Sequence, residues 1–354
     1  MNIEDLIDKR LKSEFFPGIV LKVNKKGKEI FQYTKGYRQI NPLKKEMRTD
    51  TLFDLASLTK PLATTPVALT IFEKEKIDLS TRIGNFLPEL HPETKKITIL
   101  QLLTHTSGLP PVPDIYKLFK TESEINIQAA LKHLYSLVPE VKPGSGILYS
   151  CTGYIFLTRI IMKITDKTLS KLFKNIITQP AEINSLIFNP SEIEKENTAA
   201  AEYCRWRERW IKGEVHDENS FCLNGEGGNA GLFGNADGIM KLLTILANKG
   251  TLGRKQILSP DVCSKMTNCQ TGGIHPRRGA GFLMQDTDSF AGDLFSTKSY
   301  GHTGFTGTSV WVDPANEISI VCLTNRVHFG REKTAETIKQ FRKELHSLIY
   351  KKFC

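Results

Sequence analysis

Strand-forming patterns lie near both ends of this 354-residue chain, and helical patterns fill the region between them. Short runs rich in β-branched and aromatic residues, bounded by turn residues, predict six strands. These runs are residues 19–23, 29–33, 279–284, 299–304, 309–313 and 317–324. Two connections, at residues 24–27 and 314–316, are short enough to close hairpins. The pattern predicts an α+β fold with one antiparallel sheet, in which the N-terminal hairpin pairs beside the C-terminal strands.

Helical spacing of apolar residues predicts the helices that flank this sheet. The helical segments are residues 3–16, 57–76, 99–104, 125–137, 152–164, 236–249 and 332–351. Little strand-like alternation occurs between residues 77 and 190, so we expect an all-helical domain inserted into the sheet domain. The expected division is 1–76, 77–225 and 226–354. Residues 205–224, rich in charge and Trp, are expected to form an exposed excursion.

Composition narrows the class of protein. Hydrophobic content of 40% and charged content of 24% are ordinary for a globular protein. The seven cysteines form no C-x-x-C pair and no Cys/His cluster with metal spacing, so we predict no metal and no cofactor, in a reduced compartment. The first ten residues are too charged for a signal peptide, and no window approaches the ~18–20 apolar residues that span a membrane. We therefore expect a cytoplasmic location and no membrane span.

The formal net charge of +10 raises the question of whether the chain binds nucleic acid. Lys and Arg are spread along the chain, and the mild basic clusters are not interleaved with aromatic residues as in nucleic-acid-binding surfaces. We interpret the charge as solvated faces and predict no nucleic-acid partner. Attraction of an acidic small substrate remains open. The oligomeric state is not predicted.

A serine and a lysine at i and i+3 mark the first candidate for chemistry. Ser57 and Lys60 share one face of a predicted helix, with Cβ atoms about 5–6 Å apart. A hydroxyl is a weak nucleophile unless a neighbouring base activates it, and an amine at this spacing can interact with the hydroxyl proton. The pattern alone is common, so its meaning depends on other motifs.

Two further motifs follow Ser57-x-x-Lys60 in order. Residues 143–154 contain Tyr149-Ser-Cys151, and residues 300–307 contain His302-Thr-Gly. This order resembles the family of class C β-lactamases, penicillin-binding DD-peptidases and related serine esterases and amidases, which have Ser-x-x-Lys, Tyr-x-Asn and Lys-x-Gly or His-x-Gly. The resemblance runs from about residue 14 to 345. It implies a β-lactamase/transpeptidase-like fold.

The resemblance also implies roles for these residues. Ser57 would be the acylated nucleophile, Lys60 would accept or relay its proton, and Tyr149 would be the general base and later the general acid. The backbone N–H groups of Ser57 and Phe305 would form the oxyanion hole, where one donor is typically worth about 10²–10³ in rate. The implied reaction is acyl transfer to serine and then to water, with a small-molecule substrate.

Further positions would contact the substrate. His302 would assist proton relay or bind a carboxylate or carbonyl group. Gly304 would leave room for the substrate along the strand that also carries Thr303. Cys151 and Asn229 stand at positions where the family binds substrate.

Two departures from the family pattern bear on the substrate. Cys151 replaces the usual Asn, and a thiol is a poor donor to an amide carbonyl. His302 replaces the common Lys and removes a fixed positive charge. Both changes point away from an efficient β-lactamase and towards esters or other amides. Residues 215–219 and 228–233 are similar to a subgroup that handles muropeptides, where the cleaved amide joins the N-acetylmuramic lactyl group to L-Ala, although Asn229 stands where relatives have His.

Other readings of the same residues stay open. The chain fits an amidase or esterase acting on a small cell-wall-derived acid, a β-lactamase or D-Ala-D-Ala carboxypeptidase, or an inactive binding or regulatory relative. His105 is expected to organise a turn through side-chain to backbone bonds rather than to act as a base. His216 and Asp217 are expected on a loop that rims the cleft.

Overall fold

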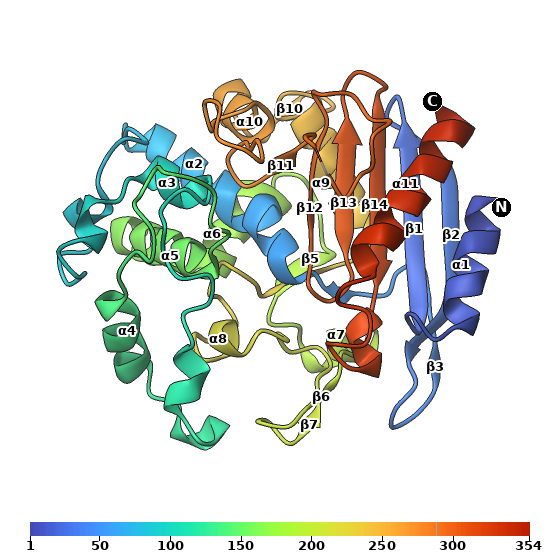
Figure 1. Cartoon of the computed structure of the whole chain (residues 1–354), viewed down its shortest axis with the longest axis horizontal. Helices are drawn as coiled ribbons and strands as arrows, with labels where there is room; N and C mark the ends of the chain where they lie inside the picture. The colour runs from blue at the N-terminus through green and yellow to red at the C-terminus, as the bar shows by residue number, and fades with distance from the viewer. Residues whose placement is uncertain (288) are drawn as a thin grey trace.

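A seven-stranded antiparallel sheet forms the centre of the computed structural model, which describes residues 1–287 and 289–354 (Figure 1). Its strand order is β11-β12-β13-β14-β1-β2-β3. The strands are β1 Gly18–Lys25, β2 Lys28–Gln39, β3 Lys45–Glu46, β11 Leu283–Met284, β12 Tyr300–Thr303, β13 Ser309–Asp313 and β14 Ile318–Thr324. The predicted α+β class and central antiparallel sheet are confirmed, and the structure adds β3 and three small sheets that were not predicted.

The two ends of the chain meet in the middle of this sheet. β1 pairs with β14 antiparallel, from Ile19 opposite Thr324 to Lys25 opposite Ile318. β1 also pairs with β2 across the tight turn at Lys26 and Gly27. The predicted pairing of the N-terminal hairpin with the C-terminal strands is therefore confirmed.

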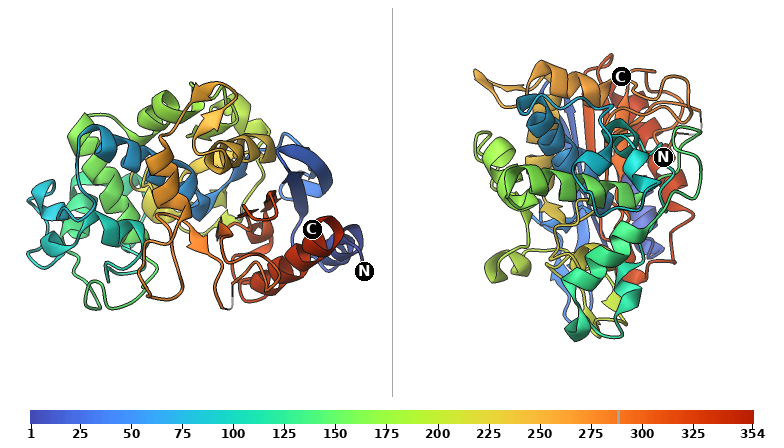
Figure 2. Two further views of the ribbon diagram at one scale, coloured as in Figure 1. Left: turned by 90° about the horizontal axis from the view of Figure 1, so that it is seen from above. Right: turned by 90° about the vertical axis from the view of Figure 1, so that its left-hand side faces the viewer.

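Both faces of the sheet are apolar, because successive side chains along a strand point to opposite faces. Ile19, Leu21 and Val23 pack in one cluster and Val20 packs in another. The first face is covered by α1 (Ile3–Lys12) and α11 (Ile338–Phe353), which lie side by side in Figure 2 (left). The opposite face packs against α9 (Ala236–Ala247).

Beyond β11 and β12, helices build the other half of the molecule (Figure 1). The helices there and in the remaining segments are α2 Thr65–Lys74, α3 Ile99–Leu103, α4 Ile127–Ser136, α5 Cys151–Thr165, α6 Leu169–Phe173, α7 Glu192–Glu196, α8 Glu218–Phe221 and α10 Pro260–Thr267. Small sheets join β4 Phe53–Asp54, β8 Leu232–Gly234 and β5 Leu186–Phe188, β6 Tyr203–Cys204 and β7 Arg209–Trp210, and β9 Thr251–Leu252 and β10 Lys255–Gln256. One apolar cluster contains residues from both halves. The division of the chain into 1–76, 77–225 and 226–354 stays a proposal, and these three parts share one apolar core.

Two local expectations were wrong in extent. The strand predicted at 279–284 is reduced to β11, because Gly281 has φ +84° and lies tightly against Thr65. The last helix starts at Ile338 rather than 332, after turns at 331–337 that begin where Arg331 forms ion pairs with Glu202 and Glu218. These tertiary contacts are not contained in the local pattern.

The predicted exposed excursion at 205–224 is largely buried, which corrects that expectation. Arg207 donates to the carbonyls of Val215 and His216, and its side chain is inaccessible. Arg209 forms an ion pair with Glu214 at 2.7 Å. Charged residues are thus buried here because partners within the same segment and nearby satisfy them.

Candidate active site

Ser57 stands on an unusual turn between the sheet and α2. The buried carboxylate of Asp54 accepts the N–H of Ala56, whose φ is +47°, and residues 56–58 form one 3₁₀ turn. A π-helical turn over Lys60–Thr64 leads into α2. A helical segment therefore begins near Ser57, as predicted, but its first two turns are not α-helical. Such π turns occur often at functional sites.

Lys60 is fully buried and lies under Ser57. Its Nζ donates to Ser57 Oγ at 3.0 Å, to the backbone carbonyl of Asn229 at 3.0 Å, and to Cys151 Sγ at 3.5 Å. An ammonium has three N–H donors, so these three acceptors satisfy it. Cys151 and Asn229 thus hold Lys60, and neither lines the cavity above Ser57.

The pKa of the Lys60 ammonium is raised. Burial acts to lower it, but the neighbouring acidic groups of Cys151 and Tyr149 act in the opposite direction and prevail. A lysine whose pKa lies above its usual value keeps its proton at neutral pH. Lys60 is therefore suited to donating to Ser57 and stabilising a nearby negative charge, rather than to accepting the serine proton.

Tyr149 lies at the centre of a group of basic side chains. The Lys60 Nζ is 4.9 Å from its ring centroid, and the guanidinium of Arg278 is 5.6 Å away. The ring stacks on His105 with centroids 4.4 Å apart and is 5.9 Å from His302. A phenolate formed here would have cationic groups close to its ring.

His302 on β12 is buried and neutral. Its Nδ1 is 2.8 Å from the carbonyl of Thr303, which only accepts, so Nδ1 carries the proton and Nε2 has a free lone pair. Burial lowers the pKa of His302 well below its usual value, and the charges of Arg278 and Lys60 add to this effect. Nε2 has no partner in the described part of the chain. His302 can therefore accept a hydrogen bond from a ligand.

A cavity of about 430 Å³ opens above Ser57. Its lining consists of Ser57, Tyr149, Arg278, Leu283, Phe290, His302, Thr303, Gly304, Phe305, Arg326, Ala335, Ile338 and Arg342. It brings together the three sequence motifs and the predicted contact residues Thr303, Gly304 and Phe305. Gly304 also has a packing role, because a Cβ there would lie 2.5 Å from the carbonyl oxygen of Leu55.

Two histidines outside the motifs behave as structural residues. His105 Nδ1 accepts the N–H of Ser150, as expected for a turn-organising residue. His216 Nε2 is 2.8 Å from Glu202, and its ring stacks on Phe305 at 5.8 Å. No group of three His, Cys, Asp or Glu residues suited to a metal occurs in residues 1–287 and 289–354.

Sequence reasoning missed seven of the thirteen lining residues, and three of these are arginines. Arg278, Arg326 and Arg342 come from separate segments of the C-terminal part and converge on it. None of the three motifs contains these arginines, and their spacing along the chain does not indicate that they lie close together.

Comparison with known proteins decides the family. A family model described as Beta-lactamase matches residues 3–343. The chain belongs to this family. Within it, the N-acetylmuramyl-L-alanine amidase of Bacillus subtilis (strain 168) is 30% identical over 349 residues, which cover 88% of this chain and 78% of that protein. This chain is therefore a serine hydrolase of the β-lactamase family.

Solved structures show the same fold at lower identity. EstCE1, a hydrolase with promiscuous acyltransferase activity, has a TM-score of 0.76 at 22% identity over 98% of this chain and 97% of its own. The D-amino acid amidase from Ochrobactrum anthropi SV3 has a TM-score of 0.75 at 20% identity over 99% and 98%. These confirm the β-lactamase/transpeptidase-like fold. In the described part of the chain, no helix combines the length and apolar character needed to span a bilayer.

Proposed function

We propose that this β-lactamase-family hydrolase cleaves a small amide or ester by forming an acyl-enzyme on Ser57. The observation that carries the proposal is the 3.0 Å hydrogen bond from Lys60 Nζ to Ser57 Oγ at the base of the cavity. A nucleophile bonded to a fixed charge and facing an open cavity has the arrangement needed for covalent catalysis.

The first half-reaction forms the acyl-enzyme. Tyr149, as phenolate, takes the proton of Ser57 Oγ while Oγ attacks the substrate carbonyl. Lys60 stabilises the phenolate and keeps Ser57 in position. The backbone N–H groups of Ser57 and Phe305 stabilise the oxyanion, and Tyr149 then passes its proton to the leaving nitrogen or oxygen.

The second half-reaction releases the acid. Tyr149 takes a proton from water, the resulting hydroxide attacks the acyl carbonyl, and Tyr149 returns the proton to Ser57 Oγ as the ester bond breaks. His302 Nε2 accepts a hydrogen bond from the substrate, and Thr303 and Gly304 line its path. Cys151 and Asn229 contribute by holding Lys60.

The favoured substrate is a cell-wall-derived amide, with the bond between the N-acetylmuramic lactyl group and L-Ala first. The support is the 30% identity to an N-acetylmuramyl-L-alanine amidase over most of both chains. A D-Ala-D-Ala carboxypeptidase or β-lactamase activity is the second candidate. A cytoplasmic location remains part of this proposal.

Labelling of Ser57 tests the mechanism. Intact-protein mass after brief exposure to a fluorophosphonate should show one adduct on the wild type, formed with loss of fluoride, and none on Ser57→Ala. Muropeptides, aryl esters and β-lactams are then compared as substrates. An adduct that persists on Ser57→Ala would overturn the assignment of the nucleophile. No adduct on either protein would favour an inactive binding relative.

A further inference from the structure

A second cavity, of about 610 Å³, lies on the other face of β11 and contains two cysteines. Leu283 lines the Ser57 cavity and its neighbour Met284 lines the second one, because successive strand side chains point to opposite faces. Cys263 on α10 and Cys269, two residues beyond the end of α10, both line it. Among the described residues the two cavities have no lining residue in common, so this cavity is a separate site.

The lining of this cavity carries three positive charges. They belong to Lys249, Arg277 and Lys298, and in the described part of the chain the lining contains no Asp or Glu. None of the three side chains belongs to an ion pair within residues 1–287 and 289–354. Arg277 Nη1 donates to the neutral carbonyls of Gln285 and Thr297. A cavity lined by charge of one sign attracts ligands of the opposite sign, so this one favours anions.

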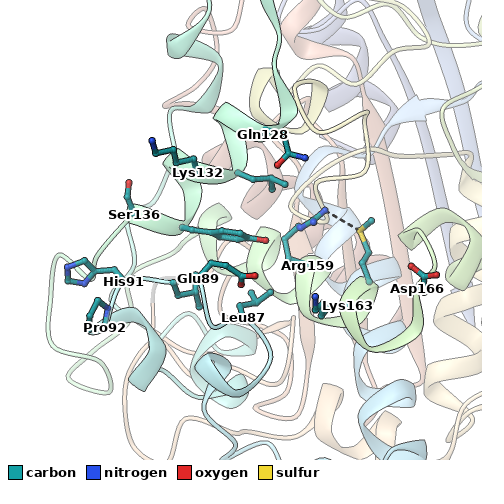
Figure 3. Close-up of a pocket in the computed structure, with 14 residues that line it drawn as sticks. Leu87, Glu89, His91, Pro92, Gln128, Lys132, Ser136, Arg159, Lys163 and Asp166 are labelled. Carbon is teal, nitrogen blue, oxygen red and sulfur yellow. Dashed lines mark hydrogen bonds between the residues drawn. The ribbon is translucent and has the colours of Figure 1, made fainter.

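The larger cavity between α4 and α5 differs in this respect (Figure 3). It also has three basic side chains, Lys132, Arg159 and Lys163, but Glu89 and Asp166 lie in the same lining. No cysteine lines it within the described residues. The combination of unbalanced positive charge with a thiol therefore distinguishes the cavity behind β11.

The Cys269 thiol is the reactive one of the pair. It is partly exposed, and its Sγ lies 3.5 Å from Thr271 Oγ1. Burial acts to raise its pKa, but hydrogen bonds from Thr271, Arg277 and Gly272 act in the opposite direction, so its pKa lies below the usual value. Burial raises the pKa of Cys263 to about 11. The thiolate is the nucleophilic form of cysteine, and Cys269 forms it more readily than Cys263.

Tyr300 gives the cavity a hydrogen-bonding group without a partner. Its side chain lines the cavity and is 1% exposed, and its hydroxyl forms no hydrogen bond with the described residues. Burial raises the pKa of this hydroxyl, so it keeps its proton and can donate. An acceptor on a ligand in the cavity would satisfy this donor, which the protein itself leaves unpaired.

We propose that Cys269 is a modification site that forms a mixed disulfide with a small anionic thiol, supplied as the disulfide of that thiol. The Cys269 thiolate attacks one sulfur of R–S–S–R, a bond from Sγ to that sulfur forms, and the S–S bond breaks as RS⁻ leaves with the electron pair. Cys269 is oxidised and the leaving sulfur is reduced, so no other oxidant is needed. Lys249, Arg277 and Lys298 attract the carboxylates of R, and Tyr300 donates to an acceptor on it.

Hydrogen bonds connect Cys269 to the active site. Thr271 Oγ1, next to the Cys269 thiol, accepts the backbone N–H of Arg278 at 3.2 Å. The backbone carbonyl of Arg278 accepts the N–H of Gln270 at 2.7 Å. The Arg278 guanidinium lies 5.6 Å from the ring centroid of Tyr149. A group attached to Sγ displaces the thiol from Thr271, so we expect it to shift Arg278 and to slow the nucleophile. This consequence rests on the proposed function, whereas the modification itself does not.

Glutathione disulfide, which is anionic, tests the site by intact-protein mass and peptide mapping. The wild type should gain one glutathionyl group at Cys269, and Cys269→Ser should gain none in that segment. The control within the chain is Cys354, which is exposed and whose pKa is raised by burial. Cys269 should react roughly tenfold faster than Cys354, because a lowered pKa supplies more thiolate. Faster modification of Cys354 than of Cys269 would overturn the proposal.

A neutral reagent, 2-hydroxyethyl disulfide, isolates the effect of charge. The ratio of the two rates at Cys269, glutathione disulfide over the neutral disulfide, should fall roughly three- to tenfold in the double variant Lys249→Gln/Lys298→Gln, since both attracting charges are lost. Lys132→Gln, in the cavity between α4 and α5, should leave the ratio unchanged. The same ratio in the wild type and the double variant would overturn the assignment of an anionic thiol.

Labelling of Ser57 tests the connection to the active site. Glutathionylated wild type should react more slowly with a fluorophosphonate than untreated protein, and dithiothreitol should restore the rate. Cys269→Ser exposed to glutathione disulfide should keep its own rate. Equal rates for modified and unmodified wild type would overturn the connection through Arg278. The mass and the rate ratios decide on the modification site even if the wild type forms no fluorophosphonate adduct.

Discussion

The imidazole of His105 stacks on the ring of the candidate general base Tyr149, with the two ring centroids 4.4 Å apart. His105 Nδ1 accepts the N–H of Ser150 at 3.0 Å, and its backbone carbonyl accepts the N–H of Leu148 at 2.9 Å. The residues on both sides of Tyr149 are therefore bonded to the same histidine. His105 is a positioning residue in this arrangement.

Replacement of His105 should act on turnover more than on binding. His105→Ala removes the stacking and the Nδ1 acceptor, and we expect kcat to fall roughly ten- to a hundredfold because small misplacements of a catalytic group are costly. His105→Asn should recover part of this loss, since its amide oxygen can accept from Ser150 and Asn tolerates the φ of +59°. The exposed His91, replaced by Ala, is the control. Equal kcat values for the Ala variant and the wild type would contradict this role.

The thiol of Cys151 should affect the reactivity of Ser57 through its contact with Lys60. Cys151→Ala removes the acceptor at 3.5 Å from Lys60 Nζ, so the ammonium loses one of three partners. We expect the rate of Ser57 labelling by a fluorophosphonate to fall roughly two- to tenfold, as for loss of a modest hydrogen bond. Cys151→Asn, which supplies an amide oxygen, should label faster than Cys151→Ala. Identical rates for all three proteins would show that Cys151 does not act on Lys60.

Gly304 is expected to be required for packing. A Cβ at this position would lie 2.1 Å from Thr308 Oγ1 and 2.5 Å from the carbonyl oxygen of Leu55. Gly304→Ala should lower the free energy of unfolding by about 1–3 kcal/mol, as for other overpacked sites. Gly146→Ala is the matched control, because a Cβ there meets nothing within 4 Å. Urea unfolding of both variants measures the difference, and similar stabilities would refute the steric argument.

His346 should make the protein sensitive to acid. It is fully buried beside Phe290, Phe295 and Trp311, and burial, with a contribution from Arg342, lowers its pKa to about 3. Below a pH of about 6.5 the unfolded chain takes up a proton at His346 that the folded chain does not, so stability falls as pH falls. At pH 5 this costs about 2 kcal/mol.

A comparison of two pH values tests the role of His346. Urea unfolding at pH 7 and pH 5 gives a stability difference for the wild type and for His346→Leu. We expect the difference to be smaller in the variant by about 2 kcal/mol, since the change in packing is common to both pH values. The same difference in both proteins would place the acid sensitivity elsewhere, for example at the buried His105 and His302.

Local patterns in the sequence predicted six of the seven strands of the main sheet and the order of the site motifs. Runs rich in β-branched residues at 19–23 and 317–324 predicted strands that pair in the structure, because such side chains favour the extended backbone. The candidate site residues Ser57, Lys60, Tyr149 and His302 were named from the sequence through the resemblance of their motifs to a family, and the structure places them close together.

Only the tertiary structure decided which charges are buried and which of them are unpaired. Residues 205–224 look exposed in the sequence because they are charged, yet Arg207 is buried by partners that folding brings to it. Arg278, Arg326 and Arg342 are indistinguishable in the sequence from solvated surface arginines. Their convergence on one cavity depends on how β11, β14 and α11 pack, and the cost of burying a cation depends on partners that no local pattern contains.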